Sequence, residues 1–309
     1  MKKNYLIIVV GPTAIGKTAM AIELAKHFKS EIVSCDSRQF YKEMNIGTAV
    51  PSLEELNAVP HHFIQNKSIF NKYTVGDYEN ESLEIIDKLF EKNPVQVVVG
   101  GSGLYVDAIL HGFDQFPDVS DEIKSIIDRN YEENGFEYLQ SELKKLDPEY
   151  FQFLQNTNAQ TLVNQQRMKR FIGVSIASNK PYSSFLNQEK RQRNFTPILI
   201  GLKADREKMY DRINQRVDIM MQNGLLKEVE NLYEHRKLNA LQTVGYREIF
   251  DFFDGNFTLN FAVEEIKKNT RRFAKRQMTW FQKYDTLHWY DFQTPSIEII
   301  RHIEKNINE

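Results

Sequence analysis

One short glycine-rich stretch constrains the fold of this chain more than any other. It comprises Gly11, Pro12, Thr13, Ala14, Ile15, Gly16, Lys17 and Thr18. The stretch matches the phosphate-binding pattern G-x-x-x-x-G-K-[ST] at every required position. Apolar residues 6–10 before it predict a buried strand, and residues 17–29 after it have the spacing of an amphipathic helix. In such a unit, backbone N–H groups, the helix N-terminus and Lys17 bind a polyphosphate, and the Thr18 hydroxyl can contact Mg²⁺.

Short apolar segments alternate with helical patterns along most of the chain. Strands are predicted at residues 5–10, 31–35, 95–99, 196–202 and 287–290. Helices are predicted between them, including residues 76–91, 205–222, 225–236 and 259–284. Several of the strands are apolar on both faces, as in parallel sheets covered by helices. The pattern predicts an α/β fold of the P-loop NTPase-like, nucleotide-kinase-like type, with a parallel sheet flanked by helices.

The middle of the chain has a different pattern. Residues 136–146, 147–154 and 159–177 all have helical spacing, and no convincing strand occurs among them. We therefore predict three parts. They are residues 1–117 as the first part of a catalytic core, residues 118–194 as an inserted all-helical domain, and residues 195–309 as the second part of the core.

Composition excludes several classes of protein. The net charge of −2 gives no overall sign of nucleic-acid binding, so any such binding must come from a local patch. A single cysteine, Cys35, rules out an internal disulfide framework or a multi-thiolate metal site. The N-terminal residues 1–4 lead directly into a strand, and no apolar run approaches the roughly 18 residues of a membrane span. We expect a cytoplasmic protein without membrane contact.

A carboxylate follows the second predicted strand. Ligands of open α/β sheets lie at the carboxyl ends of the strands, so Asp36 is expected near the phosphate-binding loop. That position suits a general base or a Mg²⁺ contact, although an aspartate here can also simply cap a turn. The long polar loop 39–51 that follows favours a functional role for Asp36 over the role of a simple turn cap.

The third predicted strand ends in Gly100-Gly-Ser-Gly-Leu-Tyr105. Many phosphate-loop hydrolases have an aspartate at this position, which holds Mg²⁺ or orients water. Here backbone N–H groups and the Ser102 hydroxyl suit an anion or the edge of a nucleobase instead. A tight structural turn is the alternative. His61 and His62 lack a third ligand at a familiar spacing, so we expect a hydrogen-bonded or surface pair rather than a metal site.

Two groups of cations lie in the C-terminal third. Arg212 and Arg216 are four residues apart on one face of a helix, so they can clamp phosphate oxygens or form surface salt bridges. Further on, a stripe of seven cations is interrupted by no acid: Lys267, Lys268, Arg271, Arg272, Lys275, Arg276 and Lys283. We expect this helix to pack against the rest of the protein through a second face and to present its cations outward. That second face contains Phe273, Gln277, Trp280, Phe281 and Tyr284. The stripe is the electrostatic footprint of a nucleic-acid contact, unless it is merely solvated. Arg167, Lys169 and Arg170 form a weaker cluster.

Together these segments resemble the tRNA dimethylallyltransferase family, also called tRNA isopentenyltransferases or IPP transferases. The matching segments are residues 11–18, 32–41, 44–51, 100–105, 212–218, 245–248 and 271–281, in the family's order and over nearly the whole chain. Three positions depart from the family pattern. Ser102 replaces the usual threonine, Ile15 replaces a serine, and residues 167–173 lack the usual acid.

The resemblance implies a reaction. The family transfers a dimethylallyl group from dimethylallyl diphosphate to N6 of the adenosine at tRNA position 37, just 3′ of the anticodon, in tRNAs reading U-initial codons. It implies that the phosphate-binding loop holds the diphosphate with Mg²⁺ on Thr18. Asp36 would accept the N6 proton, Lys17 and Arg216 would stabilise the leaving diphosphate, and Ser102 would hold the adenine or the diphosphate.

The resemblance also implies a set of tRNA contacts for a monomer that binds the anticodon stem-loop. The implied contacts are Asp36, Ser37, Arg38, Gln39, Ser102, Gln165, Gln166, Arg167, Met168, Lys169, Arg271, Arg272, Lys275 and Arg276. A nucleotide or small-molecule kinase is an alternative, because it explains the loop and the paired arginines. It does not explain the basic C-terminal helix. A nucleic-acid-binding module with a degenerate nucleotide site explains that helix but not Asp36 beside an intact loop.

Overall fold

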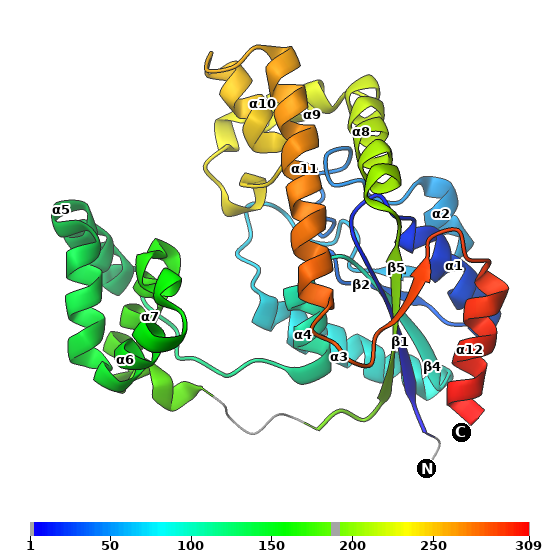
Figure 1. The fold of residues 1–309 in the computed structure, drawn as a ribbon, viewed down its shortest axis with the longest axis horizontal. Coiled ribbons are helices and arrows are strands. Elements are labelled where there is room, and N and C mark those ends of the chain that lie inside the picture. The colour runs from blue at the N-terminus through cyan, green and yellow to red at the C-terminus, as the bar shows by residue number, and fades with distance from the viewer. Residues whose placement is uncertain (1–2, 187–191, 309) are drawn as a thin grey trace. The chain divides into compact units, whose positions relative to one another are not determined.

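The fold is known from a computed structural model that describes residues 3–186 and 192–308. Met1 and Lys2 of the N-terminal segment, residues 187–191 of the predicted insertion and Glu309 lie outside the described residues. The chain separates into two compact units (Figure 1). Unit 1 contains Met1–His111 and Gln192–Glu309, and unit 2 contains Gly112–Arg191. These limits lie a few residues before the predicted boundaries at 117 and 194.

Unit 1 is built on one parallel sheet of the kind predicted from the sequence. Its strands are β1 (Tyr5–Val10), β2 (Ile32–Ser34), β3 (His61–His62), β4 (Val95–Val99), β5 (Thr196–Lys203) and β6 (His288–Asp291). They lie in the order β3-β2-β4-β1-β5-β6, and every neighbouring pair is parallel. All six residues of β1 are buried, because helices cover both faces of the centre of the sheet.

Helices cover both faces of the sheet in unit 1. The α-helices of this unit are α1 (Lys17–Phe28), α2 (Leu53–Ala58), α3 (Val75–Lys92), α4 (Gly103–His111), α8 (Arg206–Gln222), α9 (Leu225–Asn231), α10 (Tyr246–Phe253), α11 (Leu259–Phe281) and α12 (Ser296–Asn308). Tyr5, Ile7 and Val9 of β1 pack with α1 and α12. The alternate residues of β1 pack with α3, α4 and the end of α11. This alternation follows from the two-residue period of a strand.

Arg193 fastens the chain to unit 1 where it returns from the insertion. Its Nη2 lies 3.1 Å from Oε1 of Glu79, and both side chains are buried. Its guanidinium also donates to the carbonyls of Ala108 and Ile109, both at 2.8 Å. These carbonyls belong to the end of α4, where the chain leaves unit 1. A buried guanidinium needs such partners for all its donors, so Arg193 ties the two ends of the interruption together.

Unit 2 is helical throughout its described residues and has its own apolar core. Its main helices are α5 (Asp121–Leu146), α6 (Pro148–Thr157) and α7 (Gln165–Ser178), with short 3₁₀ turns at Ala159–Val163 and Tyr182–Phe185. A kink at Gly135, where φ is 62°, divides α5. The predicted single helix 159–177 is wrong in detail, because Asn164 starts a new helix by accepting from the Arg167 N–H.

Two other helix predictions need correction. The predicted helix 225–236 ends earlier, at Asn231, and a 3₁₀ turn over Tyr233–His235 follows it. The predicted docking face of the helix 259–284 is also partly wrong. Phe273 and Trp280 are 38% and 39% exposed, and the buried face holds Ala262, Ile266, Ala274, Gln277 and Phe281. Among the described residues, no helix is both long and apolar enough to cross a bilayer.

Candidate active site

The phosphate-binding loop lies between the end of β1 and the start of α1. Gly11 and Gly16 have φ values of 146° and 105°, which favour glycine, and Ala14 has a φ of 63°. Gly16 is the N-cap of α1 and provides no side-chain cap to the helix. The first N–H groups of α1 therefore face outward from a helix N-terminus, which is the arrangement that binds an anion.

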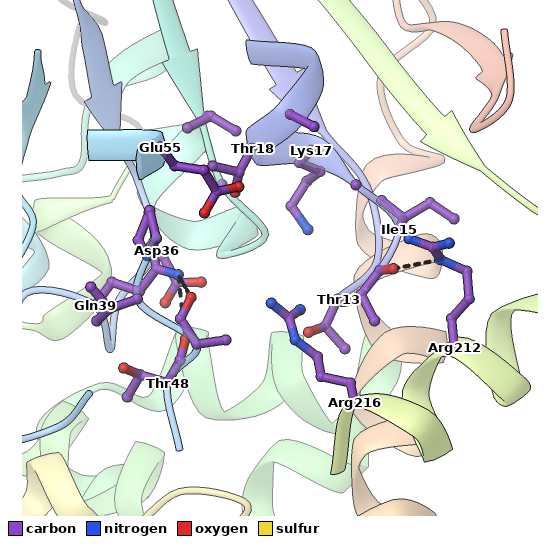
Figure 2. Close-up of a pocket in the computed structure, with 18 of the residues that line it drawn as sticks. Thr13, Ile15, Lys17, Thr18, Asp36, Gln39, Thr48, Glu55, Arg212 and Arg216 are labelled. Atoms are coloured by element: carbon purple, nitrogen blue, oxygen red, sulfur yellow. Dashed lines mark hydrogen bonds between the residues drawn. The ribbon is translucent and has the colours of Figure 1, made fainter. Parts of the chain in front are cut away.

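A cavity of about 460 Å³ opens over this loop (Figure 2). Its lining comes from the loop and α1, from the ends of β2 and β4, from the segment 48–55 and from α8. The lining residues that carry polar side chains are Thr13, Lys17, Thr18, Asp36, Gln39, Thr48, Glu55, Arg212, Gln215 and Arg216. The structure thus brings together the loop, Asp36 and both arginines, which are far apart in the sequence.

Lys17 extends into the cavity from the first turn of α1, and its Nζ donates to the Pro12 carbonyl at 2.8 Å. Burial is the main cause that lowers the pKa of Lys17 to about 8; Asp36 partly opposes this shift, and the neighbouring Arg216 adds to it. A lysine held in this way gains most from an incoming anion, because the anion restores the charge interactions lost on desolvation.

Arg212 and Arg216 of α8 have different roles. Arg212 donates from Nε to the Ala14 carbonyl at 2.8 Å and lies over the Phe292 ring, so it supports the loop. Arg216 points into the cavity between the loop and Asp36 in Figure 2. Burial lowers the pKa of Arg216, and Asp36 opposes this effect. Arg216 is therefore a cation with few protein partners beside the phosphate-binding loop. Its guanidinium is placed to bind an anion in the cavity.

Three oxygen ligands suited to Mg²⁺ surround the same cavity. They are the Thr18 hydroxyl and the carboxylates of Asp36 and Glu55. Mg²⁺ is usually held by one or two carboxylates together with substrate phosphates and water, and this donor set fits that pattern. The described residues contain no group of three or more His, Cys, Asp and Glu side chains that could hold a metal without a substrate. Cys35 is buried, and burial raises the pKa of its thiol, so it is not a nucleophile.

A second cavity of about 210 Å³ adjoins the first. The two share Thr13, Asp36, Thr48, Ala49 and Arg216. Its remaining lining includes the polar Ser37, Arg38 and Ser102 and the apolar Ile213, Val217, Met220, Val244, Ile266 and Phe273. Asp36 and Arg216 therefore stand where a phosphate-binding chamber meets a more apolar one.

Ser102 lines the second cavity only, and its hydroxyl is already engaged. Ser102 Oγ accepts from the Ser37 N–H at 3.0 Å and donates to Ser37 Oγ at 3.1 Å. Asp36 in turn accepts from the Arg38 N–H at 3.0 Å. The Arg38 guanidinium donates to the carbonyls of Asn239 and Ala240, so it holds the local structure rather than facing solvent. This network fixes the backbone around Asp36.

No prediction from the sequence concerned Glu228, whose side chain holds the segment 45–47 in place near the cavity. Glu228 of α9 accepts from the backbone N–H groups of residues 45–47 at 2.7–3.0 Å, and from the Tyr246 hydroxyl at 2.6 Å. Gln39 donates to the carbonyls of residues 48 and 49. Gly47 must be glycine, because a Cβ there would lie 2.5 Å from the Tyr246 ring. Residues 44–51 and 245–248 both match the family pattern, but nothing in the sequence indicates that Gly47 and Tyr246 are in contact.

Apart from Lys268, which pairs with Glu265, the cations of the basic stripe fall into two groups. Lys267 pairs with Asp218 at 2.9 Å, and Arg271 donates to Asn214 at 2.6 Å, so both face α8. The other group surrounds a surface hollow of about 670 Å³. It is lined by Arg272, Lys275, Arg276, Thr279, Trp280 and Lys283. Lys283 also pairs with Asp107 at 2.6 Å.

In unit 2, the first turn of α7 carries the predicted contacts. Gln165, Gln166 and Arg167 are exposed, and the last two line a hollow of about 610 Å³ together with aromatic side chains. Met168 is fully buried in the core of unit 2, so its side chain is used for packing. Lys169 pairs with Asp128 at 2.7 Å. His61 and His62 of β3 are a hydrogen-bonded pair with Val59 and Glu31, as expected from the sequence.

A parallel sheet with a phosphate-binding loop, a buried lysine and an arginine helix facing that loop defines a nucleotide-kinase-like phosphate-loop enzyme. Residues 39–284 match the family model described as IPP transferase. The chain is 65% identical to the tRNA dimethylallyltransferase of Flavobacterium johnsoniae over 98% of each chain, and 61% identical to that of Flavobacterium psychrophilum over 96% of this chain and 97% of the relative.

A solved structure agrees with these relatives. The full-length tRNA isopentenylpyrophosphate transferase of Bacillus halodurans aligns with a TM-score of 0.73 at 32% identity, covering 100% of this chain and 97% of that one. The chain therefore belongs to the tRNA dimethylallyltransferase, or IPP transferase, family. The resemblance noted in the sequence is confirmed.

Proposed function

We propose that this enzyme transfers the dimethylallyl group of dimethylallyl diphosphate to N6 of the adenosine at position 37 of tRNAs that read U-initial codons. The observation that carries the proposal is the meeting of the two cavities at Asp36 and Arg216. One cavity suits a diphosphate and the other suits an apolar prenyl chain and a nucleobase. A carbon–nitrogen bond can form only where these two chambers meet.

The chain's own groups account for the movement of charge and protons. As the adenine nitrogen attacks the allylic carbon, the bond from that carbon to the diphosphate oxygen breaks. Lys17, Arg216 and the N–H groups at the start of α1 stabilise the charge that develops on the leaving diphosphate. Asp36 accepts the proton released from N6, because it is the carboxylate lining both cavities. The product is N6-dimethylallyladenosine.

Mg²⁺ is part of the proposal. Thr18 would hold the ion, with Glu55 as the carboxylate partner and the diphosphate as the remaining ligand. Bound there, the ion would neutralise part of the charge on the leaving group. Ser102 contributes by holding the Ser37 backbone beside the adenine chamber.

The tRNA partner is proposed from two surfaces, one in each unit. In unit 1, Arg272, Lys275 and Arg276 border the hollow on α11 and suit phosphate contacts. In unit 2, Gln165, Gln166 and Arg167 are exposed on α7 and suit the anticodon loop. The target adenosine must leave its stack to reach Asp36, as in other enzymes that modify a base. We further propose a cytoplasmic monomer.

One assay tests the proposed reaction. The protein is incubated with labelled dimethylallyl diphosphate and unmodified tRNA that reads a U-initial codon, and ATP serves as a parallel donor. We expect label in the tRNA, at N6-dimethylallyladenosine after digestion, and release of diphosphate. Transfer of a phosphoryl group from ATP without any prenylated nucleoside would favour the kinase alternative and contradict the proposal.

The α11 surface gives a separate prediction. Replacing both Lys275 and Arg276 by alanine should weaken tRNA binding and reduce the slope of log K against log salt by about one to two, because up to two phosphate contacts are lost. Both side chains are exposed. The measurement is a filter-binding titration at several salt concentrations.

The matched control for this prediction removes the same charge elsewhere. Lys88 and Lys92 of α3 are exposed lysines, with 66% and 71% of their side chains accessible. Replacing both by alanine should leave the salt slope unchanged. Equal slopes for the wild type and the α11 double variant would exclude α11 as a tRNA contact.

A further inference from the structure

Gln277 is a buried polar side chain near the C-terminal end of the basic helix α11. It is 6% exposed and contacts residues that follow the carboxyl ends of the neighbouring parallel strands β1 and β4. Its Oε1 accepts from the Thr13 N–H at 2.9 Å, and its Nε2 donates to the Gly101 carbonyl at 2.8 Å. One amide therefore joins the phosphate-binding loop to the turn after β4. Both ends of the amide are needed, because one bond uses an acceptor and the other uses a donor.

The turn after β4 is shaped to admit this side chain. A Cβ at Gly101 would lie 2.2 Å from Gln277 Nε2, and a Cβ at Gly103 would lie 2.2 Å from Trp280 Cδ1. Side chains at these two positions would displace the side chains of Gln277 and Trp280. The glycines of the segment 100–105 thus have a packing role that the sequence alone did not reveal.

The phosphate-binding loop needs support of this kind. Ala14 has a positive φ, which is uncommon for a residue with a Cβ. Three side chains hold the backbone on either side of it: Lys17 at Pro12, Gln277 at Thr13 and Arg212 at Ala14. Lys17 and the α8 arginines also face the cavity, whereas Gln277 does not line it. Gln277 can therefore act on an anion only through the loop.

We propose that Gln277 is a positioning residue that holds Thr13 and Gly101 together, so that the loop presents its N–H groups in the geometry that binds a diphosphate. This inference rests on the proposed function only for the identity of the natural diphosphate. The same bridge places the RNA-facing helix and the diphosphate loop on one rigid support. It predicts that removal of the bridge weakens binding of inorganic pyrophosphate even when no tRNA is present.

The test uses two variants of the full chain. Gln277→Glu keeps the shape and the acceptor, but the ionised carboxylate cannot donate to the Gly101 carbonyl. A carboxyl buried at this position takes up a proton more readily than an exposed one, because burial disfavours its charged form. Protonated, it has one donor and one acceptor and can restore both bonds. Gln277→Leu removes both bonds at every pH with little change in volume.

Binding of Mg²⁺–pyrophosphate is measured by calorimetry between about pH 6 and about pH 8.5. At the upper pH we expect both variants to bind at least about tenfold more weakly than the wild type, because buried backbone groups lose their partners. At the lower pH we expect Gln277→Glu to recover most of the loss, whereas Gln277→Leu does not. Circular dichroism and melting curves identify any variant that is not folded.

Gln215→Glu is the matched control, because Gln215 lines the cavity but lies at the exposed face of α8. It adds the same charge without breaking the bridge, so any effect on pyrophosphate binding should not recover at the lower pH. Wild-type affinity in Gln277→Leu would overturn the proposal, and so would a loss in Gln277→Glu that does not change with pH. Neither result depends on turnover, so failure of prenyl transfer would be recognised separately by the tRNA assay.

Discussion

Replacing Asp36 by alanine is expected to reduce the rate of dimethylallyl transfer by about a thousandfold or more, while tRNA binding is largely retained. A positioned general base contributes about 10²–10⁴ to a rate. Asp36 is the carboxylate that lines both cavities, and its backbone surroundings are fixed by Ser102 and Ser37. The measurement is single-turnover transfer of label to tRNA, with filter binding for tRNA affinity.

Glu55 provides the matched control for Asp36. It lines the phosphate cavity but not the adjoining one, so its conversion to glutamine can disturb Mg²⁺ but cannot remove the base. We expect added Mg²⁺ to restore part of the transfer rate of Glu55→Gln but not that of Asp36→Asn. Near-wild-type turnover in Asp36→Ala would exclude the role of general base.

Replacing Lys17 by methionine is expected to have opposite effects on activity and stability. Transfer should fall by about a thousandfold, because the leaving diphosphate loses a desolvated charge partner. The unliganded protein should gain roughly 1–3 kcal/mol of stability near neutral pH, because a charge is no longer buried. Single-turnover kinetics measure the first effect, and thermal or urea unfolding measures the second.

The pH dependence gives the sign of the Lys17 effect. The pKa of Lys17 is about 8 in the folded chain, below its ordinary value of 10.5. Below about pH 8 the group is charged in both states, and the folded state bears the full cost of desolvation. Between these two values the unfolded chain binds more protons, so wild-type stability should rise with pH through this contribution.

In Lys17→Met this contribution to the rise should be absent. Lys26→Met is the control, because Lys26 lies on the same helix, is 54% exposed and pairs with Glu23 at the surface. It should change neither activity nor the pH dependence of stability. Lower stability of Lys17→Met than of the wild type at neutral pH would contradict the assignment of a desolvated charge.

Local sequence patterns were sufficient for five of the six strands and for the phosphate-binding loop, whereas the two-residue strand β3 was missed. Residues 11–18 act within one strand–loop–helix unit, so their spacing alone indicates the structure around Gly16 and Lys17. The meeting of Asp36 with the loop followed from a general rule about strand ends. Arg212 and Arg216 are four residues apart on one face of α8, so both side chains line the same cavity.

Contacts between distant residues could not be predicted in the same way. The bond from Gln277 to Thr13 spans 264 positions, and that from Glu228 to Gly47 spans 181. Helical spacing placed Gln277 on a buried face, but no sequence pattern indicates which distant residue Gln277 or Glu228 contacts. The docking face of α11 was predicted only in part. Gln277 and Phe281 are buried as expected, but Phe273 and Trp280 at similar spacing are exposed. Small residues such as Ala274 allow close packing instead, and Phe273 is left exposed.

The order of the sheet has a consequence for synthesis of the protein on the ribosome. β1 lies between β4 and β5, and β5 is made only after the whole of unit 2 has been translated. Until then, one edge of the most buried strand has no partner in the nascent chain. Such an edge can pair with another polypeptide. The interruption of unit 1 therefore lengthens the time during translation in which this edge of β1 is open to mispairing.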